Sequence, residues 1–417
     1  MKNIGFLTRC IKNSSDGKTV LTNFGYLSLL QVAGYIFPLL TMPYLAKTIG
    51  SDGFGKIAFA SAVIVWFQTI TDWGFNFTST RDVAQNRDDK LLVSQIFSNV
   101  LWARCFLTII SGLLLFVLTC IIPVFHCNKE IILFTFLMVP GHILFPDWFF
   151  QAIERMKYTT ILNLLLKFIF TIAVFVFIKE KDDYLLQPLI TSVGYLLCGF
   201  ISLYIILRKW EYKIYAPNVG TIYITIKNSF DVFLNNLMPN LYNSFSIILL
   251  GQFGGPNATG IFDGGNRFIT IINQLQSVLS RAFFPFLSRR ANKFSLFSKI
   301  NMAVAFFFSI ALFVSAPLIV KIMLAPEFAD SIVVLRILSV SIIFMAMNVS
   351  YGQNYLIISR HEKDLRNITI IASVTGMAIA IPLVYFYDYI GATITILISR
   401  ILLGTMTYVK YLKYKSK

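Results

Sequence analysis

Residues 99–123 read NVLWARCFLTIISGLLLFVLTCIIP, and this stretch decides the class of fold. No charged residue lies between Arg104 and Pro123. A helix of about 20 apolar residues crosses the roughly 30 Å hydrocarbon core of a bilayer. The stretch therefore predicts a transmembrane helix.

The rest of the chain shares this apolar character. Of its 417 residues, 56% are hydrophobic and 13% are charged, whereas a soluble domain has about 45–50% apolar and about 25% charged residues. This composition excludes a soluble enzyme, a disordered tail and a nucleic-acid-binding module. The five cysteines show no metal-binding spacing and the three histidines are scattered, so we expect neither a structural metal nor a cofactor.

Working outward from residues 99–123, twelve apolar segments are long enough to cross the membrane. They lie at residues 22–46, 54–76, 99–123, 130–151, 158–178, 184–207, 229–251, 259–282, 297–320, 330–357, 367–387 and 390–410. The sequence therefore predicts an all-α polytopic membrane protein with twelve transmembrane helices.

The basic residues indicate which side of the membrane each loop faces. Of the 36 lysines and arginines, twenty-five lie in or beside the termini and the loops on the same side, six lie in or beside the opposite loops, and five lie more than three residues inside a span. Because basic residues concentrate in cytoplasmic loops, this distribution predicts that both termini are cytoplasmic. The net charge of +16 is thus mainly a topology signal, and we expect no nucleic-acid partner.

The predicted loops are too short for a catalytic domain. None exceeds about 30 residues, whereas an independent domain usually needs at least about 50. The chain also lacks the G-x-x-x-x-G-K-[ST] motif of nucleotide-binding P-loops. We therefore expect neither an ATP-driven pump nor an enzyme.

The chain aligns weakly with itself at an offset of 205 residues. Gly50 and Gly55 align with Gly255 and Gly260, and several polar positions align as well. Shared hydrophobicity does not explain a match of glycines and polar residues. The alignment therefore predicts an internal repeat of two halves with six spans each.

This repeat predicts the domain organisation. An N-terminal six-helix bundle would cover residues 1–208, a cytoplasmic linker residues 209–228, and a C-terminal six-helix bundle residues 229–417. Halves that share their orientation are related by a pseudo-two-fold axis along the membrane normal, with the substrate between them. We expect a V-shaped molecule with a central cavity.

The predicted span 259–282 has a polar face. At 100° per residue, that face carries Asp263, Asn266, Arg267, Thr270, Asn273, Gln274, Ser277 and Arg281. A charge at the bilayer centre costs at least about 2.5–3.5 kcal/mol, so the face is predicted to line a cavity. A helix lying in the membrane interface would give the same pattern, but the short loops on both sides favour a span.

Polar residues mark other predicted spans too. The seventh span carries Asn236 and Asn240, the fifth has Lys167 in its middle, and the second has Asp72 near its cytoplasmic end. Arg400 lies within the twelfth span. Because such residues are costly in lipid, we predict that they face the cavity.

Five basic residues lie more than three residues inside a predicted span. For Lys167, Arg267 and Arg400 a functional role is favoured, because a buried cation needs a compensating interaction. Arg104 and Arg336 lie near span ends, where snorkelling to the membrane surface explains them equally well.

Cations surrounded by neutral amides favour an anionic ligand with many hydroxyl groups, such as a phosphate-linked sugar. An exporter of organic cations would instead show buried carboxylates and an aromatic cage. The carboxylates Asp72, Asp231 and Asp263 are few. They are either ion-pair partners of Arg267 and Arg281 or sites for a coupling proton or sodium ion, and the sequence leaves both open.

A series of motifs resembles a known transporter family. The motifs are Pro43-Tyr44-Leu45-Ala46-Lys47-Thr48-Ile49-Gly50, Phe54-Gly55, Gly74-Phe75-Asn76-Phe77-Thr78-Ser79-Thr80-Arg81, Pro146-Asp147-Trp148-Phe149-Phe150-Gln151-Ala152, Gly260-Ile261-Phe262-Asp263-Gly264-Gly265-Asn266, Tyr351-Gly352-Gln353 and Gly391-Ala392-Thr393-Ile394-Thr395. In their order and spacing, over essentially the whole length, the chain resembles the O-antigen flippase (Wzx) branch of the polysaccharide transporter family. That family belongs to the multidrug/oligosaccharidyl-lipid/polysaccharide exporter superfamily.

The resemblance implies a flippase of the bacterial inner membrane. Such a protein moves an undecaprenyl-diphosphate-linked O-antigen repeat unit from the cytoplasmic to the periplasmic leaflet by alternating access, with the lipid tail left among the membrane lipids. An O-antigen polymerase and a ligase are the partners that the resemblance implies. The rival interpretations are a multidrug or organic-cation antiporter of the same superfamily and a non-transporting membrane assembly factor.

On this interpretation the polar residues divide into two groups. The predicted substrate-binding residues are Lys167, Arg267, Arg281, Arg400, Asn266, Asn273, Gln274, Asn236 and Asn240. The residues predicted to couple transport to a proton or sodium gradient are Asp72 and Asp263.

Overall fold

The computed structural model describes residues 15–289 and 294–415, and in these ranges it consists of helices and short connections without any strand. The first half of the chain contains α2 (Ser15–Asp72), α3 (Phe75–Gln85), α4 (Lys90–Ile121), α5 (Pro123–Cys127), α6 (Lys129–Phe136), α7 (Met138–Leu144), α8 (Asp147–Ala152), α9 (Met156–Phe177), the 3-10 helix η1 (Lys181–Leu185), α10 (Leu186–Tyr204) and the π-helix η2 (Ile205–Lys209).

The second half is also helical. It contains α11 (Val219–Asn228), α12 (Phe230–Leu237), the 3-10 helix η3 (Met238–Leu241), α13 (Ser244–Phe253), α14 (Gly255–Arg289), α15 (Phe294–Met323), the 3-10 helix η5 (Pro326–Phe328), α16 (Ser331–Met347), the π-helix η6 (Asn348–Leu356) and α17 (Glu362–Lys415).

The described residues include eight helices that are long and apolar enough to cross a membrane. The protein therefore has a polytopic, all-helical membrane fold. Two of these helices each cover two predicted spans. The 58 residues of α2 are broken at Gly50, and the 54 residues of α17 are broken at Asp388, where φ is 46°.

Two predicted spans are not among the eight apolar helices. The predicted span 229–251 is divided into α12, η3 and α13, and Pro239 lies in the 3-10 segment. A proline ring removes a backbone donor and interrupts the helix at this point. The predicted span 259–282 lies within α14, whose 35 residues include the polar face.

The repeat-related glycines occupy equivalent positions in the backbone. Gly50 has a φ of 68° and Gly255 a φ of 80°, in the left-handed region that glycine adopts at low cost. Five residues further on, Gly55 and Gly260 lie where α2 crosses α14. A Cβ atom on Gly55 would overlap the carbonyl oxygen of Pro256, and one on Gly260 would overlap that of Ser51.

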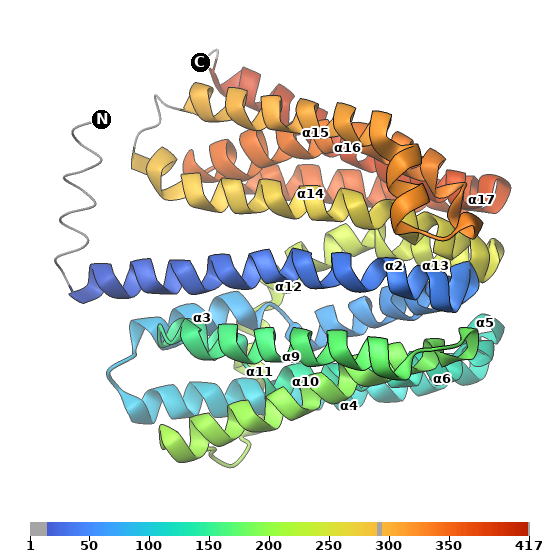
Figure 1. The fold of residues 1–417 in the computed structure, drawn as a ribbon. Helices are drawn as coiled ribbons and strands as arrows, with labels where there is room; N and C mark the ends of the chain where they lie inside the picture. Colours follow the sequence, from blue (N-terminus) through green and yellow to red (C-terminus); the bar gives the residue numbers. More distant parts are fainter. Residues whose placement is uncertain (1–14, 290–293, 416–417) are drawn as a thin grey trace.

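The helices form two groups that meet along α2. Helices α14 to α17 lie on one side of α2, and α9 packs against its other side together with the helices of the first half (Figure 1). The start of α2 and the end of α17 lie at the same end of the molecule (Figure 1). Because α14 packs between α2 and α16, its position argues against a helix lying alone in the membrane interface.

One apolar core joins the two groups. Its buried members include Ile49 and Phe54 of α2, Phe262 of α14 and Leu335 of α16. The ring of Phe54 meets that of Phe328 edge to face, with centroids 5.5 Å apart. Aromatic side chains of this size bury large areas, so the core fixes α2 against the second half.

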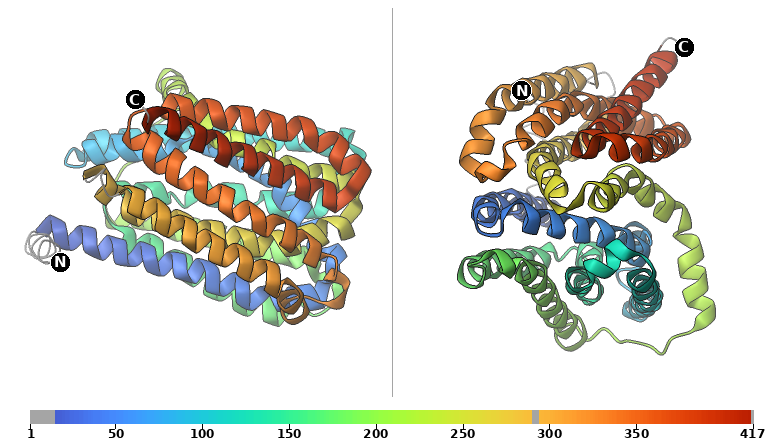
Figure 2. Two further views of the ribbon diagram at one scale, coloured as in Figure 1. Left: turned by 90° about the horizontal axis from the view of Figure 1, so that it is seen from above. Right: turned by 90° about the vertical axis from the view of Figure 1, so that its right-hand side faces the viewer.

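The connection between the halves runs along the side of the first half (Figure 2). Residues 211–218 are non-helical, and α4 holds them by hydrogen bonds. The N–H of Tyr215 donates to Ser98 Oγ at 3.0 Å, and Trp102 Nε1 donates to the carbonyl oxygen of Tyr215 at 2.9 Å. Further on, the hydroxyls of Ser229 and Thr78 are 2.8 Å apart.

Candidate functional site

Four helices enclose a pocket that contains two of the predicted cations. This cationic pocket has a volume of about 250 Å³ and is lined by Phe37, Pro38, Thr41 and Leu45 of α2, Leu166, Lys167 and Phe170 of α9, Gln187, Thr191 and Tyr195 of α10, and Arg267 of α14. Residues from both halves of the chain therefore contribute to one site. The structure brings together Lys167 and Arg267, which lie 100 positions apart in the sequence.

The side chain of Lys167 reaches the cationic pocket from the middle of α9. A Cβ atom on Gly34 of α2 would lie 3.5 Å from Lys167 Nζ, an ordinary van der Waals contact, so the ammonium group lies close to this glycine. In the described part of the chain, no carboxylate lies within ion-pair distance of Lys167. An ammonium group in this position favours an anion as its partner.

Arg267 is held in place by two neighbours. Its Nε donates to Asp263 Oδ2 at 2.8 Å, one helical turn earlier, and its guanidinium carbon lies 4.1 Å from the centroid of the Phe54 ring. The Arg267 side chain remains 34% exposed and that of Asp263 15% exposed. Asp263 therefore offsets the charge of Arg267, and the charge of Lys167 leaves the pocket cationic.

Asp72 forms an ion pair, but with a different arginine from the two considered from the sequence. Arg104 Nη2 donates to Asp72 Oδ1 at 2.6 Å and to Asn76 Oδ1 at 2.8 Å. The side chain of Arg104 is only 3% exposed, so the interpretation of Arg104 as a snorkelling residue is wrong. Inside the protein, α2 and α3 supply two acceptors for Nη2 of the guanidinium group.

The other predicted site residues are spread over the second half. Asn266 and Asn273 are half-buried on α14, whereas Gln274 and Arg281 are exposed. Arg281 Nε donates to the carbonyl oxygen of Ser277 at 3.3 Å. None of these four residues is in the lining of the cationic pocket, and their part in binding stays a prediction.

The same holds for Arg400 and for the two asparagines of the seventh predicted span. Arg400 is buried and its Nη1 donates to Ser341 Oγ at 2.9 Å. Asn240 Nδ2 donates to Thr69 Oγ1 at 2.9 Å, whereas Asn236 is exposed. The structure places all three outside the lining of the cationic pocket.

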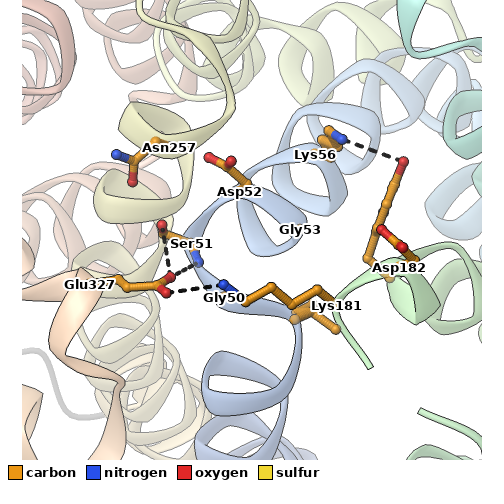
Figure 3. Close-up of a pocket in the computed structure, with 11 residues that line it drawn as sticks. Gly50, Ser51, Asp52, Gly53, Lys56, Lys181, Asp182, Asn257 and Glu327 are labelled. Carbon is orange, nitrogen blue, oxygen red and sulfur yellow. Dashed lines mark hydrogen bonds and ion pairs between the residues drawn. The ribbon is translucent and has the colours of Figure 1, made fainter. Parts of the chain in front are cut away.

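A larger pocket, of about 550 Å³, lies at the break of α2 (Figure 3). Its lining mixes both signs of charge, with Lys56 and Lys181 beside Asp52, Asp182 and Glu327. This pocket lies where helices end, and its charges offset one another. It is therefore a weaker candidate for an anion site than the cationic pocket.

Glu327 of η5 is hydrogen-bonded to α2 (Figure 3). Its Oε2 accepts a hydrogen bond from the backbone N–H of Ser51 at 3.0 Å, and Lys181 Nζ lies 3.4 Å from its Oε1. The backbone hydrogen bond from Ser51 and the charge of Lys181 lower the pKa of Glu327 below its usual value of 4.5.

Sequence reasoning missed three polar residues of the cationic pocket. Gln187, Thr191 and Tyr195 follow one another at steps of four along α10. This spacing places them on one face of a helix, so the sequence pattern could have identified them. In the described ranges, no group of three or more histidine, cysteine, aspartate or glutamate side chains is placed to hold a metal ion.

Comparisons with known proteins identify related chains and folds. Residues 20–291 match the family described as polysaccharide biosynthesis protein. The "Putative O-antigen transporter" of Escherichia coli (strain K12) is 27% identical over 393 residues, which are 92% of this chain and 94% of that protein. A protein of the same name from Shigella dysenteriae is 24% identical, over 91% of this chain and 97% of its own length.

Solved structures show the same fold. The lipid II flippase MurJ in an inward closed conformation has a TM-score of 0.74 at 13% identity, over 94% of this chain and 87% of its own. The eukaryotic MATE transporter AtDTX14 has a TM-score of 0.58 at 16% identity, over 95% and 93%. At these identities the likeness establishes the fold alone.

Proposed function

Because the chain belongs to the polysaccharide biosynthesis protein family, we propose that it is a flippase for an undecaprenyl-diphosphate-linked O-antigen repeat unit. The repeat unit would cross from the cytoplasmic to the periplasmic leaflet of the bacterial inner membrane. The likeness to two proteins named as O-antigen transporters supports this class of substrate, and the fold shared with MurJ is compatible with it.

The observation that carries the proposal is the meeting of Lys167 and Arg267 in one pocket. Arg267 keeps an acidic partner, whereas Lys167 has no ion pair in the described ranges. A diphosphate offers several acceptor oxygens to both cations at once, and such charge-assisted hydrogen bonds are stronger than neutral ones. The sugars would occupy the polar space between the halves, while the prenyl chain stays among the membrane lipids.

Transport would follow alternating access between two six-helix bundles, residues 1–208 and 229–417, that together supply twelve transmembrane helices. The equivalent backbone positions of Gly50 and Gly255 support two parallel repeats. The start of α2 and the end of α17 lie at the same end of the molecule (Figure 1), which supports two termini on one side, the cytoplasmic side by the distribution of basic residues.

A proton or sodium gradient would drive the cycle through Asp72 or Asp263. Both carboxylates are ion-paired in this conformation, Asp72 with Arg104 and Asp263 with Arg267. Coupling would therefore require that the ion replace an arginine as the partner of the carboxylate. An O-antigen polymerase and a ligase would act on the delivered repeat unit.

An antiporter for organic cations of the same superfamily is the second candidate. It would need an unpaired carboxylate in the cationic pocket, and no acidic residue lines that pocket. A non-transporting assembly factor would not need charged residues from both halves in one pocket. The charge of the pocket therefore favours the flippase.

Complementation of a flippase-null strain tests the proposal. Arg267→Ala should abolish surface O-antigen while the protein remains at its normal level in the membrane. Arg336→Ala is the matched control, because Arg336 is exposed on α16. Normal O-antigen with Arg267→Ala would contradict the assignment of Arg267, and drug efflux by a wild-type chain that does not complement would favour the antiporter.

A further inference from the structure

A second polar pocket lies beside the same two helices as the cationic pocket. It has a volume of about 190 Å³ and is lined by Leu30 of α2, Asn76 of α3, Asp147, Trp148 and Gln151 of α8, and Met156 and Thr159 of α9. We refer to it as the Asp147 pocket. It is smaller than the pockets of about 300 Å³ and more that hold drug-sized ligands, so it suits a single ring.

Three polar side chains are accessible to a ligand in the Asp147 pocket. Asn76, Asp147 and Gln151 are all exposed, and the carboxylate of Asp147 forms no ion pair in the described ranges. Asp147 and Gln151 lie on α8, whose Trp148 is 3% exposed and stacks on Phe97. The polar groups therefore sit on a rigid support.

Asn76 is oriented by a buried ion pair. Arg104 binds Asp72 at 2.6 Å and donates to Asn76 Oδ1 at 2.8 Å. Because the carbonyl oxygen of the Asn76 amide is taken, its NH₂ group remains as the donor. The ion pair thus prepares Asn76 to donate a hydrogen bond.

The wall of the Asp147 pocket contains a hydroxyl without a partner. Thr159 is 7% exposed, and its Oγ1 has no hydrogen bond. Thr171 of the same helix, by contrast, donates to the carbonyl oxygen of Lys167 in the preceding turn. A buried polar group without a partner costs free energy, so this hydroxyl indicates that a polar ligand or water belongs here.

The chemistry of the lining favours neutral hydroxyl groups over anions. None of the residues that line the Asp147 pocket is basic, in contrast to the cationic pocket. A carboxylate accepts hydrogen bonds from hydroxyls, and an amide both donates and accepts. A sugar ring presents such groups around its edge, whereas a phosphate would be repelled by Asp147.

The two pockets follow one another along the same two helices. Both are lined by α2 and α9, and Thr159 precedes Lys167 by eight residues, about 12 Å along the helix. His142 stacks on Tyr195 at a centroid distance of 4.1 Å, and Tyr195 lines the cationic pocket. An extended ligand with an anionic part and a hydroxyl-rich part can therefore occupy both.

We propose that Asn76, Asp147 and Gln151 form a subsite for the hydroxyl groups of the sugar ring nearest the diphosphate. This inference rests on the proposed function, because it assigns the anionic part of the same substrate to Lys167 and Arg267. The subsite distinguishes a sugar-bearing lipid from the bare lipid carrier.

Binding of two lipids to the purified full-length protein tests the subsite. The probes are undecaprenyl diphosphate and the same lipid carrying one N-acetylglucosamine, measured by native mass spectrometry. Wild type should bind the sugar-bearing lipid about tenfold more tightly, since hydrogen bonds to a charged group are worth that much. Asp147→Ala should remove this preference and leave the affinity for the bare lipid unchanged, and Gln151→Ala should reduce it in part.

Further variants separate this inference from the proposed function. Lys167→Gln should weaken the binding of both lipids equally. Asp88→Ala removes an exposed carboxylate outside the pocket and should change neither affinity. A preference that is missing in wild type or that persists in the Asp147→Ala/Gln151→Ala double variant overturns the subsite. Loss of binding of both lipids in Asp147→Ala also overturns the subsite. A wild-type protein that binds neither lipid would overturn the proposed function itself.

Discussion

The interface between α2 and α14 contains two regions of opposite character. At Gly55 and Gly260 the helices touch through their backbones, because neither residue has a side chain to separate them. Seven residues further along α14, about 10 Å away, Arg267 faces the cationic pocket. The comparison shows that residue size decides where the halves form a closed contact and where they leave room for a ligand.

The largest effect is expected at the closed contact between Gly55 and Gly260, when a methyl group is added at Gly55. Gly55→Ala would place a Cβ atom against the Pro256 carbonyl oxygen and near Gly260 N, and backbone atoms cannot rotate away. We expect a loss of about 3 kcal/mol of stability, at the upper end for overpacking, seen as a lower thermal midpoint in detergent. Gly25→Ala is the control, because a Cβ there meets nothing within 4 Å. Equal midpoints for the two variants would contradict the crossing.

At Gly255, the repeat-related glycine of α14, the cost of backbone strain can be measured separately from the cost of steric crowding. Gly255 has a φ of 80° and open space around its Cβ position. Gly255→Ala should therefore cost only the strain of a left-handed residue, roughly 1–2 kcal/mol, in the same thermal measurement. A loss as large as that of Gly55→Ala would show that crowding also acts at this position.

The charged region of this interface, which consists of Asp263 and Arg267 at the cationic pocket, can be tested by a double-mutant cycle between these two residues. The ion pair is partly exposed, so we expect a coupling energy of about 1 kcal/mol in thermal unfolding. Asp263→Asn alone should increase the affinity for undecaprenyl diphosphate, because it frees the charge of Arg267. A weaker affinity in that variant would mean that Asp263 positions Arg267 for binding.

The smallest effect is expected at Glu327, and it should depend on pH. Because its folded-state pKa lies below the unfolded value of 4.5, its contribution to stability is present above about pH 4.5 and is lost as the pH falls through the folded pKa. Wild type should therefore unfold at a higher temperature than Glu327→Gln near neutral pH, with the difference vanishing once the pH lies below the folded-state pKa of Glu327. A constant difference would exclude ionisation of Glu327 as its source.

The sequence predicted the charged region better than the closed contact. The polar face of α14 singled out Arg267, and the central position of Lys167 in an apolar span indicated a buried cation. Both predictions depend on the cost of charge in lipid, which is a local property of one helix. The repeat alignment also matched Gly50 with Gly255, which share their backbone conformation.

Which acidic residue pairs with which arginine could not be predicted from the sequence in the same way. Asp72 was considered as a partner for Arg267 or Arg281, but it binds Arg104, because the packing of α4 against α2 decides which arginine is within reach. The Asp147 pocket combines residues of four helices, none of which carries a continuous polar stripe toward it. Such sites depend on tertiary packing, which periodicity along a single helix does not reveal.

The connection between the halves sets a limit on their relative motion. An extended chain reaches about 3.3–3.6 Å per residue, so a free segment over residues 211–218 would be a slack tether of almost 30 Å. The hydrogen bonds of Tyr215 to α4 and of Ser229 to Thr78 fasten this segment to the first half. The covalent link that remains free of these hydrogen bonds is therefore the short step from Ser229 to α12.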